Sequence, residues 1–511
     1  MNTWSPPALG WRPDQPRNPV APAIGATPEG NCSTLKLASK PHRPRRRARN
    51  SAYVNPLIIV SHRVSRPQSS TAPGGLAVGV LAALRQCGGT WVGWSGTLAD
   101  EPASSPQVSE DEGIRYATVD LPHSDFDAYY SGFCNGSLWP LCHYFPERFR
   151  YDATEYVAYQ AINRRIASAV VSLGSVSHPI WVHDYQLVAA GRYLRAEGMN
   201  GPIGFFLHIP FPHVEMLRIL PVYAELVRDL CQYDLVGFQT EQDLEAFRSA
   251  VRDVFGEEAI RAATHVVADG RKVGVGVFPI GVDVDAIAAQ AAEAQSDDQV
   301  QRLVAGLLGR KLLLGVDRLD YSKGLVERFT AYRHLLESSP EHLGNITYIQ
   351  IAPLSRVNVA AYAEIRDALE KAAGHTNGQY ADTDWTPVRY LNKDFPHHVL
   401  LGFLRCANVC AVTPVRDGMN LVAKEFVAAQ DPENPGALVL SNMAGAAHEL
   451  TDALLVNPYD ERAVAAALRE ALELPLADRR ARHAKMLAVL RRNTIRHWHE
   501  SFVATLRSSS Q

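Results

Sequence analysis

Short, continuous apolar runs alternate with longer helical stretches from Leu57 onward, and this alternation limits the possible folds more than any other feature of the chain. The runs are LIIVSHR, PIWVHDYQL, IGFFLHIPFP, DLVGFQT, VGVFPIGVD, KLLLGVDRLD, ITYIQIAP, ANVCAVTP and GALVLSNMAG. Continuous apolar strands separated by helices are typical of parallel sheets that are covered on both faces. Two such series meet near residue 280, so we predict an α/β protein with two doubly wound domains.

The composition excludes several classes of partner. A formal net charge of −3 argues against bulk electrostatic binding of nucleic acid or of an anionic membrane. No apolar run approaches the roughly 20 residues that a membrane-spanning helix needs. The seven cysteines are odd in number and scattered, without a CxxC pair, which suits reduced thiols in a cytosol. We therefore expect a cytoplasmic protein that binds neither nucleic acid nor membrane.

Four segments are predicted along the chain. Residues 1–52 are rich in Pro and Arg, lack apolar periodicity and are predicted to be a disordered tail. Residues 53–284 and 285–488 are predicted to be the two doubly wound domains. The last segment, 489–511, has an amphipathic helical pattern, and we expect it to pack on the first domain.

Polar residues follow the predicted strands at their carboxyl ends. In open α/β sheets, ligands bind beyond these ends. The residues found there are Arg63, Asp184, His208, Arg318, Arg356, Arg416 and Asp417. Their distribution over both predicted domains indicates a ligand cleft between the domains.

Two loops contain residue types suited to phosphate. In APGGLAVG, Gly74 and Gly75 allow backbone amides to approach a ligand at a helix start, although a tight turn without a ligand fits equally well. In DRLDYSKG, Arg318 and Lys323 could clamp a diphosphate. The alternative is that both cations form surface ion pairs with Asp317, Asp320 or Glu327.

Other catalytic motifs are absent from the sequence. It contains no HExxH, no metal-spaced Cys/His cluster and no GxSxG, so metallohydrolase and serine-hydrolase functions have no support. His208 lies at a strand end before two prolines, and a lone histidine in such a place is more often a structural residue than a catalyst. Trp94 in WVGWSG and Trp139 in LWP have core packing as the ordinary explanation, although tryptophan faces also line sugar sites.

Taken in order, these motifs resemble one family, the bacterial alpha,alpha-trehalose-phosphate synthases, which are retaining glucosyltransferases. The resemblance spans about Leu57 to Leu506 and includes SHR, GGLAVG, GWSG, YYSGFCNGSLWP, WVHDYQL, GFFLHIPFP, GFQTE, VFPIGVD, RLDYSKGL, QIAPLSR, TPVRDGMNLVAKEFVAAQ and NPGALVLSNMAGAAHEL. It implies a GT-B fold, in which two Rossmann-like domains face a deep cleft. It also implies transfer of glucose from UDP-glucose to glucose 6-phosphate, giving trehalose 6-phosphate and UDP in trehalose biosynthesis, a pathway linked to osmotic stress.

The resemblance assigns donor-binding residues. It implies that Arg318 and Lys323 hold the diphosphate, that Gly74 and Gly75 offer backbone contacts, and that Phe395 contacts the uracil. Asp417 and His208 would bind hydroxyls of the transferred glucose. The remaining donor residues form the start of a helix, where backbone amides would cradle the phosphates and Glu425 would accept from the ribose: they are Leu421, Val422, Ala423, Lys424 and Glu425.

Within this segment the residues themselves predict a helix that begins near Met419 or Asn420, with Glu425 one turn beyond Leu421 on the same face. Among the four charged residues of the segment Thr413–Gln430, Lys424 is the least explained. We expect its side chain to be solvated or to have a local role.

The resemblance also assigns the acceptor site and the catalytic groups. Arg63 and Arg356 would bind the 6-phosphate with help from Tyr130, while Asp184 and Trp94 would border the sugar. The catalytic residues would be His208, Asp417, Arg318 and Lys323. In the motif SHR, His62 replaces the asparagine that is common in the family, which leaves its role open but not that of Arg63.

The remaining expectations concern cofactors, assembly and alternatives. No metal is required where Arg and Lys neutralise the diphosphate, although a stimulatory Mg²⁺ stays open, and we expect a homo-oligomer, either a dimer or a tetramer. One alternative function is another GT-B glucosyltransferase with a different nucleotide-glucose or acceptor. Another is a catalytically dead sugar-phosphate sensor.

Overall fold

The computed structural model describes residues 56–65, 75–174, 178–354 and 360–509. The predicted disordered tail (1–52) lies outside these residues, as do the predicted ligand residues Gly74 and Arg356. The described strands form two sheets, one of nine strands and one of six. Each apolar run of the sequence contributes a strand to one of these sheets, which confirms the predicted α/β class.

The first sheet contains β1 (Leu57–Arg63), β2 (Gly89–Ala99), β3 (Gln107–Asp111), β4 (Ile114–Pro122), β5 (Ile180–His183), β6 (Ile203–Phe206), β7 (Leu235–Phe238), β8 (His265–Ala268) and β9 (Arg271–Val277). Their order is β3-β4-β2-β1-β5-β6-β7-β9-β8. Neighbours are parallel except for the pairs β3 with β4 and β8 with β9. The central strands β5, β6 and β7 are buried along their whole length, as expected for a sheet covered on both faces.

The second sheet contains β10 (Lys311–Val316), β11 (Ile346–Ile351), β12 (Val388–Leu391), β13 (Val409–Val412), β14 (Ala437–Ser441) and β15 (Leu454–Val456). Their order is β12-β11-β10-β13-β14-β15, and every neighbouring pair is parallel. The carboxyl ends of all its strands therefore lie at one edge.

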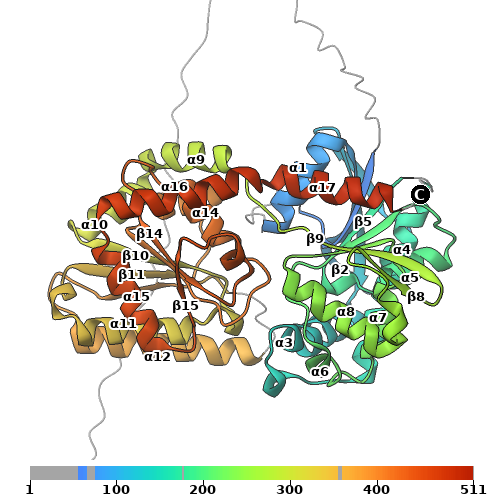
Figure 1. Cartoon of the computed structure of the whole chain (residues 1–511), viewed down its shortest axis with the longest axis horizontal. Helices are drawn as coiled ribbons and strands as arrows, with labels where there is room; N and C mark the ends of the chain where they lie inside the picture. Colours follow the sequence, from blue (N-terminus) through green and yellow to red (C-terminus); the bar gives the residue numbers. More distant parts are fainter. Residues whose placement is uncertain (1–55, 66–74, 175–177, 355–359, 510–511) are drawn as a thin grey trace, which may run out of the picture. The chain divides into compact units, whose positions relative to one another are not determined.

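Helices connect the strands in both halves of the chain (Figure 1). Those between strands of the first sheet are α1 (Gly75–Cys87), α2 (His123–Phe126), the π-helix η1 (Asp127–Leu138), α3 (Trp139–Cys142), α4 (Ala153–Ser172), α5 (Ala190–Ala196), α6 (Val214–Leu217), α7 (Tyr223–Leu230) and α8 (Glu241–Phe255). After β9 follow α9 (Val284–Glu293), α10 (Asp298–Leu307), the 3₁₀-helix η6 (Tyr321–Lys323), α11 (Leu325–Ser338), the 3₁₀-helix η7 (Pro340–His342), α12 (Ala360–Tyr380), α13 (His397–Cys406), α14 (Leu421–Ala429), α15 (Glu461–Glu473), α16 (Leu476–Arg492) and α17 (Ile495–Ser508). None of the described helices is long and apolar enough to cross a membrane.

The chain passes from the first sheet to the second between β9 and β10. In this interval α9 packs on α13 and α14, which both connect strands of the second sheet. The predicted domain boundary after residue 284 lies at the start of α9 and stays a prediction.

The last helix, α17, returns to the first sheet and lies beside α1 (Figure 1). The ring of Phe502 stacks on Trp181 of β5 with 4.5 Å between ring centroids, and Trp498 lies 4.8 Å from the same ring. A Cβ atom on Gly204 of β6 would lie only 2.8 Å from the Phe502 ring. Glycine in the strand therefore makes room for the aromatic side chains that attach α17 to this sheet.

Candidate active site

The loops after β10 and β13 bring Lys323 and Asp417 together. These strands are parallel neighbours, so their carboxyl ends lie side by side. The ammonium of Lys323 donates to Oδ2 of Asp417 at 2.5 Å. The loops approach closely at Gly324, where a Cβ atom would lie 2.3 Å from the Thr413 carbonyl oxygen. Two predicted donor-binding residues, far apart in sequence, thus form a single ion pair.

Asp417 remains a carboxylate in this setting. Burial acts to raise its pKa, but the charge and hydrogen bond of Lys323 outweigh it and hold the pKa below its usual value. Asn420 adds a further hydrogen bond, from Nδ2 to Oδ2 of Asp417 at 3.0 Å. The negative charge is therefore fixed and oriented from two directions.

Asn420 also caps α14, whose first residue is Leu421, one residue after the later of the two predicted starts. Its Oδ1 accepts from the backbone N–H of Ala423 at 3.2 Å. Only the first N–H groups of a helix lack an intrahelical acceptor, so the amides of Leu421 and Val422 are the ones left for an anion. The predicted cradle of backbone amides is consequently supported at its first two residues and not along the whole run.

Lys424 corrects one expectation from the sequence, because its side chain is neither solvated nor restricted to local contacts. It is 0 % exposed, and its ammonium donates to the carbonyl oxygen of Ile280 at 2.7 Å and to Glu449 Oε2. Burial lowers the Lys424 pKa, and the charge of Glu449 opposes this. Glu449 in turn accepts from Asn493 at 2.7 Å. Lys424 therefore connects α14 to the segments before α9 and before α17, and its side chain does not face a ligand.

Glu425, predicted to meet the ribose, has a partner that the sequence analysis missed. His397, the first residue of α13, places Nε2 3.2 Å from Oε1 of Glu425. This hydrogen bond raises the His397 pKa. Phe395, the predicted uracil contact, lies just before this helix and packs on Phe403 with 5.2 Å between ring centroids. Glu425, one predicted nucleoside contact, is thus hydrogen-bonded to a histidine that follows Phe395, the other, by two residues.

Arg318 is exposed, and no ion pair joins it to another described residue. Its Cζ lies 5.9 Å from the centroid of the Trp139 ring. Asp317 is instead bound by the buried Arg328 at 2.6 Å, and Asp320 accepts from Tyr362 at 3.0 Å. The alternative in which Arg318 pairs with neighbouring carboxylates is therefore wrong, and its guanidinium is free to bind an anion.

At the end of β1, the predicted phosphate ligand Arg63 lies against Trp94. The two residues are paired in register between β1 and β2, and Arg63 Cζ lies 5.4 Å from the Trp94 ring centroid. Gly96 leaves room for the guanidinium, since a Cβ atom there would lie 3.0 Å from Arg63 Nη2. The structure thus places a cation beside an aromatic face, an arrangement suited to a sugar phosphate.

His62 and Tyr130 complete this aromatic group. Tyr130, on the π-helix η1, stacks on the His62 ring at 4.9 Å, and His62 Nδ1 lies 3.0 Å from the Tyr129 hydroxyl. Burial and the nearby Arg63 lower the His62 pKa to about 3, so the ring is neutral at neutral pH. His62, whose role the resemblance left open, therefore orders the tyrosines around the predicted phosphate site.

Asp184 and His208 meet at the ends of β5 and β6. Oδ1 of Asp184 accepts from the backbone N–H of His208 at 3.1 Å. Asp184 has φ 74° and ψ 167°, a conformation that is almost restricted to glycine and costs about 1–3 kcal/mol. Such strain persists mainly where function requires it, which supports a site at this position. Burial lowers the pKa of His208 to about 3, so its ring is also neutral.

Gly418 brings the two sheets together at this point. A Cβ atom on Gly418 would lie 2.2 Å from the His208 carbonyl oxygen and 3.0 Å from Cα of Ile209. The loop that holds Asp417 therefore lies directly against the segment that holds His208, and only glycine fits between them. The structure thus brings together Asp417, Asp184 and His208, three of the residues predicted from strand ends, with Lys323 of the predicted diphosphate loop.

Two further residues near this group were missed by the sequence analysis. His143 stacks on Trp139 at 4.0 Å, and burial lowers its pKa to about 4 although Asp320 and Asp417 oppose the shift. Tyr144, which follows it, lies under Arg416 with 3.9 Å between Cζ and the ring centroid. Their position three and four residues after the LWP motif was the available signal.

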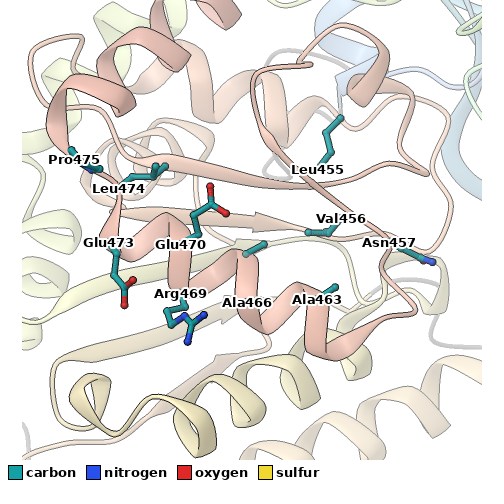
Figure 2. Close-up of a pocket in the computed structure, with 11 residues that line it drawn as sticks. Leu455, Val456, Asn457, Ala463, Ala466, Arg469, Glu470, Glu473, Leu474 and Pro475 are labelled. Carbon is teal, nitrogen blue, oxygen red and sulfur yellow. The ribbon is translucent and has the colours of Figure 1, made fainter.

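Other candidate sites lie elsewhere on the molecule. A hollow of about 660 Å³ lies between α15 and β15, and none of the predicted site residues lines it. Figure 2 labels residues that do line it. Among the described residues, one cluster has side chains suited to a metal, with ligand atoms of Glu341, His342 and Glu473 within 4.8 Å of one another. His342 precedes the amino end of β11, so this cluster is at the edge of the sheet opposite to the strand ends described above.

Comparison with known proteins identifies the chain's family. The family model described as glycosyltransferase family 20 matches residues 54–508. The chain belongs to glycosyltransferase family 20. It is therefore an enzyme of the glycosyltransferase class, as the sequence predicted. The trehalose-6-phosphate synthase of Cronobacter sakazakii is 46% identical over 458 residues, covering 88% of this chain and 95% of that protein.

Solved structures of family 20 relatives have the same fold. An alpha,alpha-trehalose-phosphate synthase from Burkholderia xenovorans in complex with glucose-6-phosphate is 45% identical, with a TM-score of 0.86 over 89% of this chain and 100% of that chain. A second structure, from E. coli and bound with UDP-2-fluoro glucose, is 46% identical, with a TM-score of 0.85 over 89% and 99% of the two chains. These similarities confirm the GT-B fold.

Proposed function

We propose that this family 20 enzyme transfers glucose from UDP-glucose to glucose 6-phosphate with retention, giving alpha,alpha-trehalose 6-phosphate and UDP. Relatives that match nearly the whole chain are trehalose-6-phosphate synthases. Two solved relatives are complexes with glucose-6-phosphate and with a UDP-glucose analogue. The observation that supports this function best is the contact between Gly418 and His208, because it brings the loop of Asp417 to His208, which also contacts Asp184 of the predicted acceptor site.

The donor would lie along the ends of β10 and β13. Arg318, which forms no ion pair with a described residue, would meet the diphosphate with its planar guanidinium. The Lys323 ammonium has three N–H donors, of which one goes to Asp417, so two remain for phosphate oxygens. The amides of Leu421 and Val422 would add contacts at the positive end of α14. Cleavage of the glycosyl bond leaves charge on the UDP phosphate, and these fixed groups would stabilise it.

The acceptor would lie at the ends of β1 and β5. Arg63 would bind the 6-phosphate, with Tyr130 beside it and Trp94 against the sugar. Asp184 is held in its strained conformation at the border with His208, where it can accept from an acceptor hydroxyl. Arg356 remains the predicted second phosphate ligand, and it lies outside the described residues.

Retention would follow from attack on the same face of the sugar that UDP leaves. The donor phosphate would take the proton of the attacking hydroxyl, and UDP would leave with that proton. Asp417 carries the depressed pKa of an ion-paired carboxylate and would bind glucose hydroxyls, while neutral His208 would orient the sugar. Neither residue is required to form a covalent bond, in contrast to the two-carboxylate scheme of retaining glycosidases.

An assay of UDP release decides between the donors. The enzyme is incubated with glucose 6-phosphate and UDP-, ADP- or GDP-glucose, and the product is identified as trehalose 6-phosphate by mass spectrometry. We expect turnover with UDP-glucose. Arg318→Ala should lower kcat by about 10²–10³-fold, because removal of one fixed hydrogen-bond donor to the developing charge costs about this much. Arg302→Ala, on α10, is the control. Turnover with another donor alone would identify a different glucosyltransferase, and binding without turnover of any donor would identify a sensor.

Other properties remain predictions. A homo-oligomer, an activity independent of metal and a cytoplasmic location are expected on the grounds given above, as is a part in osmotic stress. Gel filtration with light scattering would measure the first of these. Addition of EDTA and of Mg²⁺ to the UDP-release assay would measure the second.

A further inference from the structure

His183, at the end of β5, has no role in the function proposed so far. It is 0 % exposed, and its Nδ1 lies 3.1 Å from Nε2 of His208. The next residue, Asp184, accepts from the backbone N–H of His208. One short segment therefore contacts both the main chain and the ring of His208.

The His183 ring is held by aromatic side chains. Ring centroids of Trp181, Trp498 and Phe206 lie 4.5, 6.1 and 6.5 Å away. Trp498 belongs to α17 and also lies 5.9 Å from the His208 ring. The last helix of the chain thus packs against both histidines, and the fully buried His183 ring has no room to turn freely.

The second nitrogen of His183 decides which ring donates. Nε2 of His183 is buried and finds no hydrogen-bond partner among the described residues. Burial lowers the pKa of both rings, so each has a single N–H at neutral pH. If His208 donated to His183, the Nε2 of His183 would carry a buried N–H without an acceptor, which is the rarer and costlier arrangement. The opposite direction leaves only an unused lone pair.

We propose that His183 is a positioning residue that donates from Nδ1–H to His208 Nε2 and thereby fixes His208 as its Nδ1–H tautomer. This inference rests on the proposed function and names how its site works. His208 is partly exposed, whereas the edge with Nε2 faces the buried His183. The Nδ1–H is then the group that His208 offers to a hydroxyl of the transferred sugar.

Fixing the tautomer and ring angle matters because transfer depends on placement. Displacement of a hydrogen-bonding group in the site by about 1 Å can lower the rate about 10²-fold. A His208 ring without its partner would sample flipped orientations, in some of which an acceptor faces the sugar hydroxyl. We therefore expect His183 to affect kcat much more than KM.

The test compares two variants of His183 with a matched control in UDP-release kinetics. His183→Leu removes the donor, and His183→Asn places an amide NH₂ near the position of Nδ1. The control is His483→Leu on α16. His483 is also buried (3% exposed), and its Nε2 donates a hydrogen bond to the Val427 carbonyl oxygen at 2.9 Å. We expect kcat to fall by about 10- to 100-fold in His183→Leu, with both KM values within about threefold of wild type. His183→Asn should recover most of the loss, and His483→Leu should keep the wild-type kcat.

The outcomes separate this inference from the proposed function. An inactive wild-type enzyme would refute the function itself. An active wild type with His183→Leu as fast as His483→Leu would refute the positioning role, and so would equal loss in the Asn and Leu variants. Two-bond ¹H–¹⁵N spectra of the histidine-labelled enzyme, assigned with His208→Gln, give an independent readout. We expect an Nδ1–H signal for His208 that is lost in His183→Leu, and an Nε2–H signal in the wild type would overturn the assignment.

Discussion

Replacement of Lys424 by methionine tests how the site is attached to the rest of the molecule. Lys424 is 0 % exposed, and the side chain of its partner Glu449 is 9% exposed. The pair connects α14 to Ile280, before α9, and to Asn493, before α17. Methionine preserves most of the side-chain volume and removes the charge, so its effect reports the ion pair and not a cavity.

The expected loss is large for a single substitution. Breaking a buried ion pair by removing one partner costs about 3–5 kcal/mol, because the remaining charge loses its compensation. Glu449 would keep the hydrogen bond from Asn493, so we expect the lower end, about 3 kcal/mol in the free energy of unfolding. Lys485→Met is the control: Lys485 also pairs with an aspartate, Asp452 at 3.0 Å, but its side chain is 69% exposed. An exposed pair of this kind contributes about 0–1 kcal/mol.

Urea-induced unfolding followed by tryptophan fluorescence measures both variants. We expect the midpoint of Lys424→Met to move by several times the shift of Lys485→Met. The double variant Lys424→Met with Glu449→Gln should recover part of the stability, since no buried charge is left alone. Equal shifts for the two lysine variants would refute the reasoning, and so would a double variant less stable than Lys424→Met alone.

Three further predictions concern the site. Gly418→Ala should nearly abolish turnover and lower the unfolding midpoint, because its Cβ would lie 2.2 Å from the His208 carbonyl oxygen; an active variant would contradict this contact. Glu425→Gln should raise the KM for UDP-glucose more than it lowers kcat. The hydrogen bond to Glu425 raises the His397 pKa, so protonated His397 stabilises the fold, and this stabilisation is lost as the pH rises through the raised pKa. Glu425→Gln should therefore also remove this pH dependence of the free energy of unfolding. His143 has its pKa lowered to about 4, so below about pH 6.5 the unfolded state binds more protons and stability falls as the pH falls, by up to about 1.4 kcal/mol per pH unit. His143→Gln should show a shallower acid dependence in urea unfolding between pH 6.5 and pH 4.5, and an unchanged slope would show that the ring is not buried as neutral.

Much of the fold could be predicted because its signals are local. Each continuous apolar run marks a strand, since a strand covered on both faces has no polar side. Some of the strands that escaped prediction lack such a run. β3, QVSED, is almost wholly exposed, and β2, GTWVGWSGTLA, is interrupted by glycines and polar residues. The order of the strands in each sheet could not be predicted from the sequence either, because strand pairing joins segments that are distant in sequence.

The site divides in the same way. Arg63, Asp184, His208, Arg318 and Asp417 were found because parallel sheets bind ligands at their carboxyl ends, and position in the sequence reveals those ends. The helix start beside Leu421 and Val422 followed from the local pattern, whereas their role at the phosphates was implied by the family resemblance.

The sequence by itself determined the α/β class, the family resemblance and the strand-end residues, because each depends on residues that are neighbours along the chain. Only the tertiary structure decided their partners. His183 with His208 and Lys424 with Glu449 are each 25 residues apart, and His397 with Glu425 are 28 apart. Whether a charge is solvated, paired or buried depends on what the folded chain places against it. For that reason Lys424, expected to be solvated or local, proved to be a buried link between distant segments.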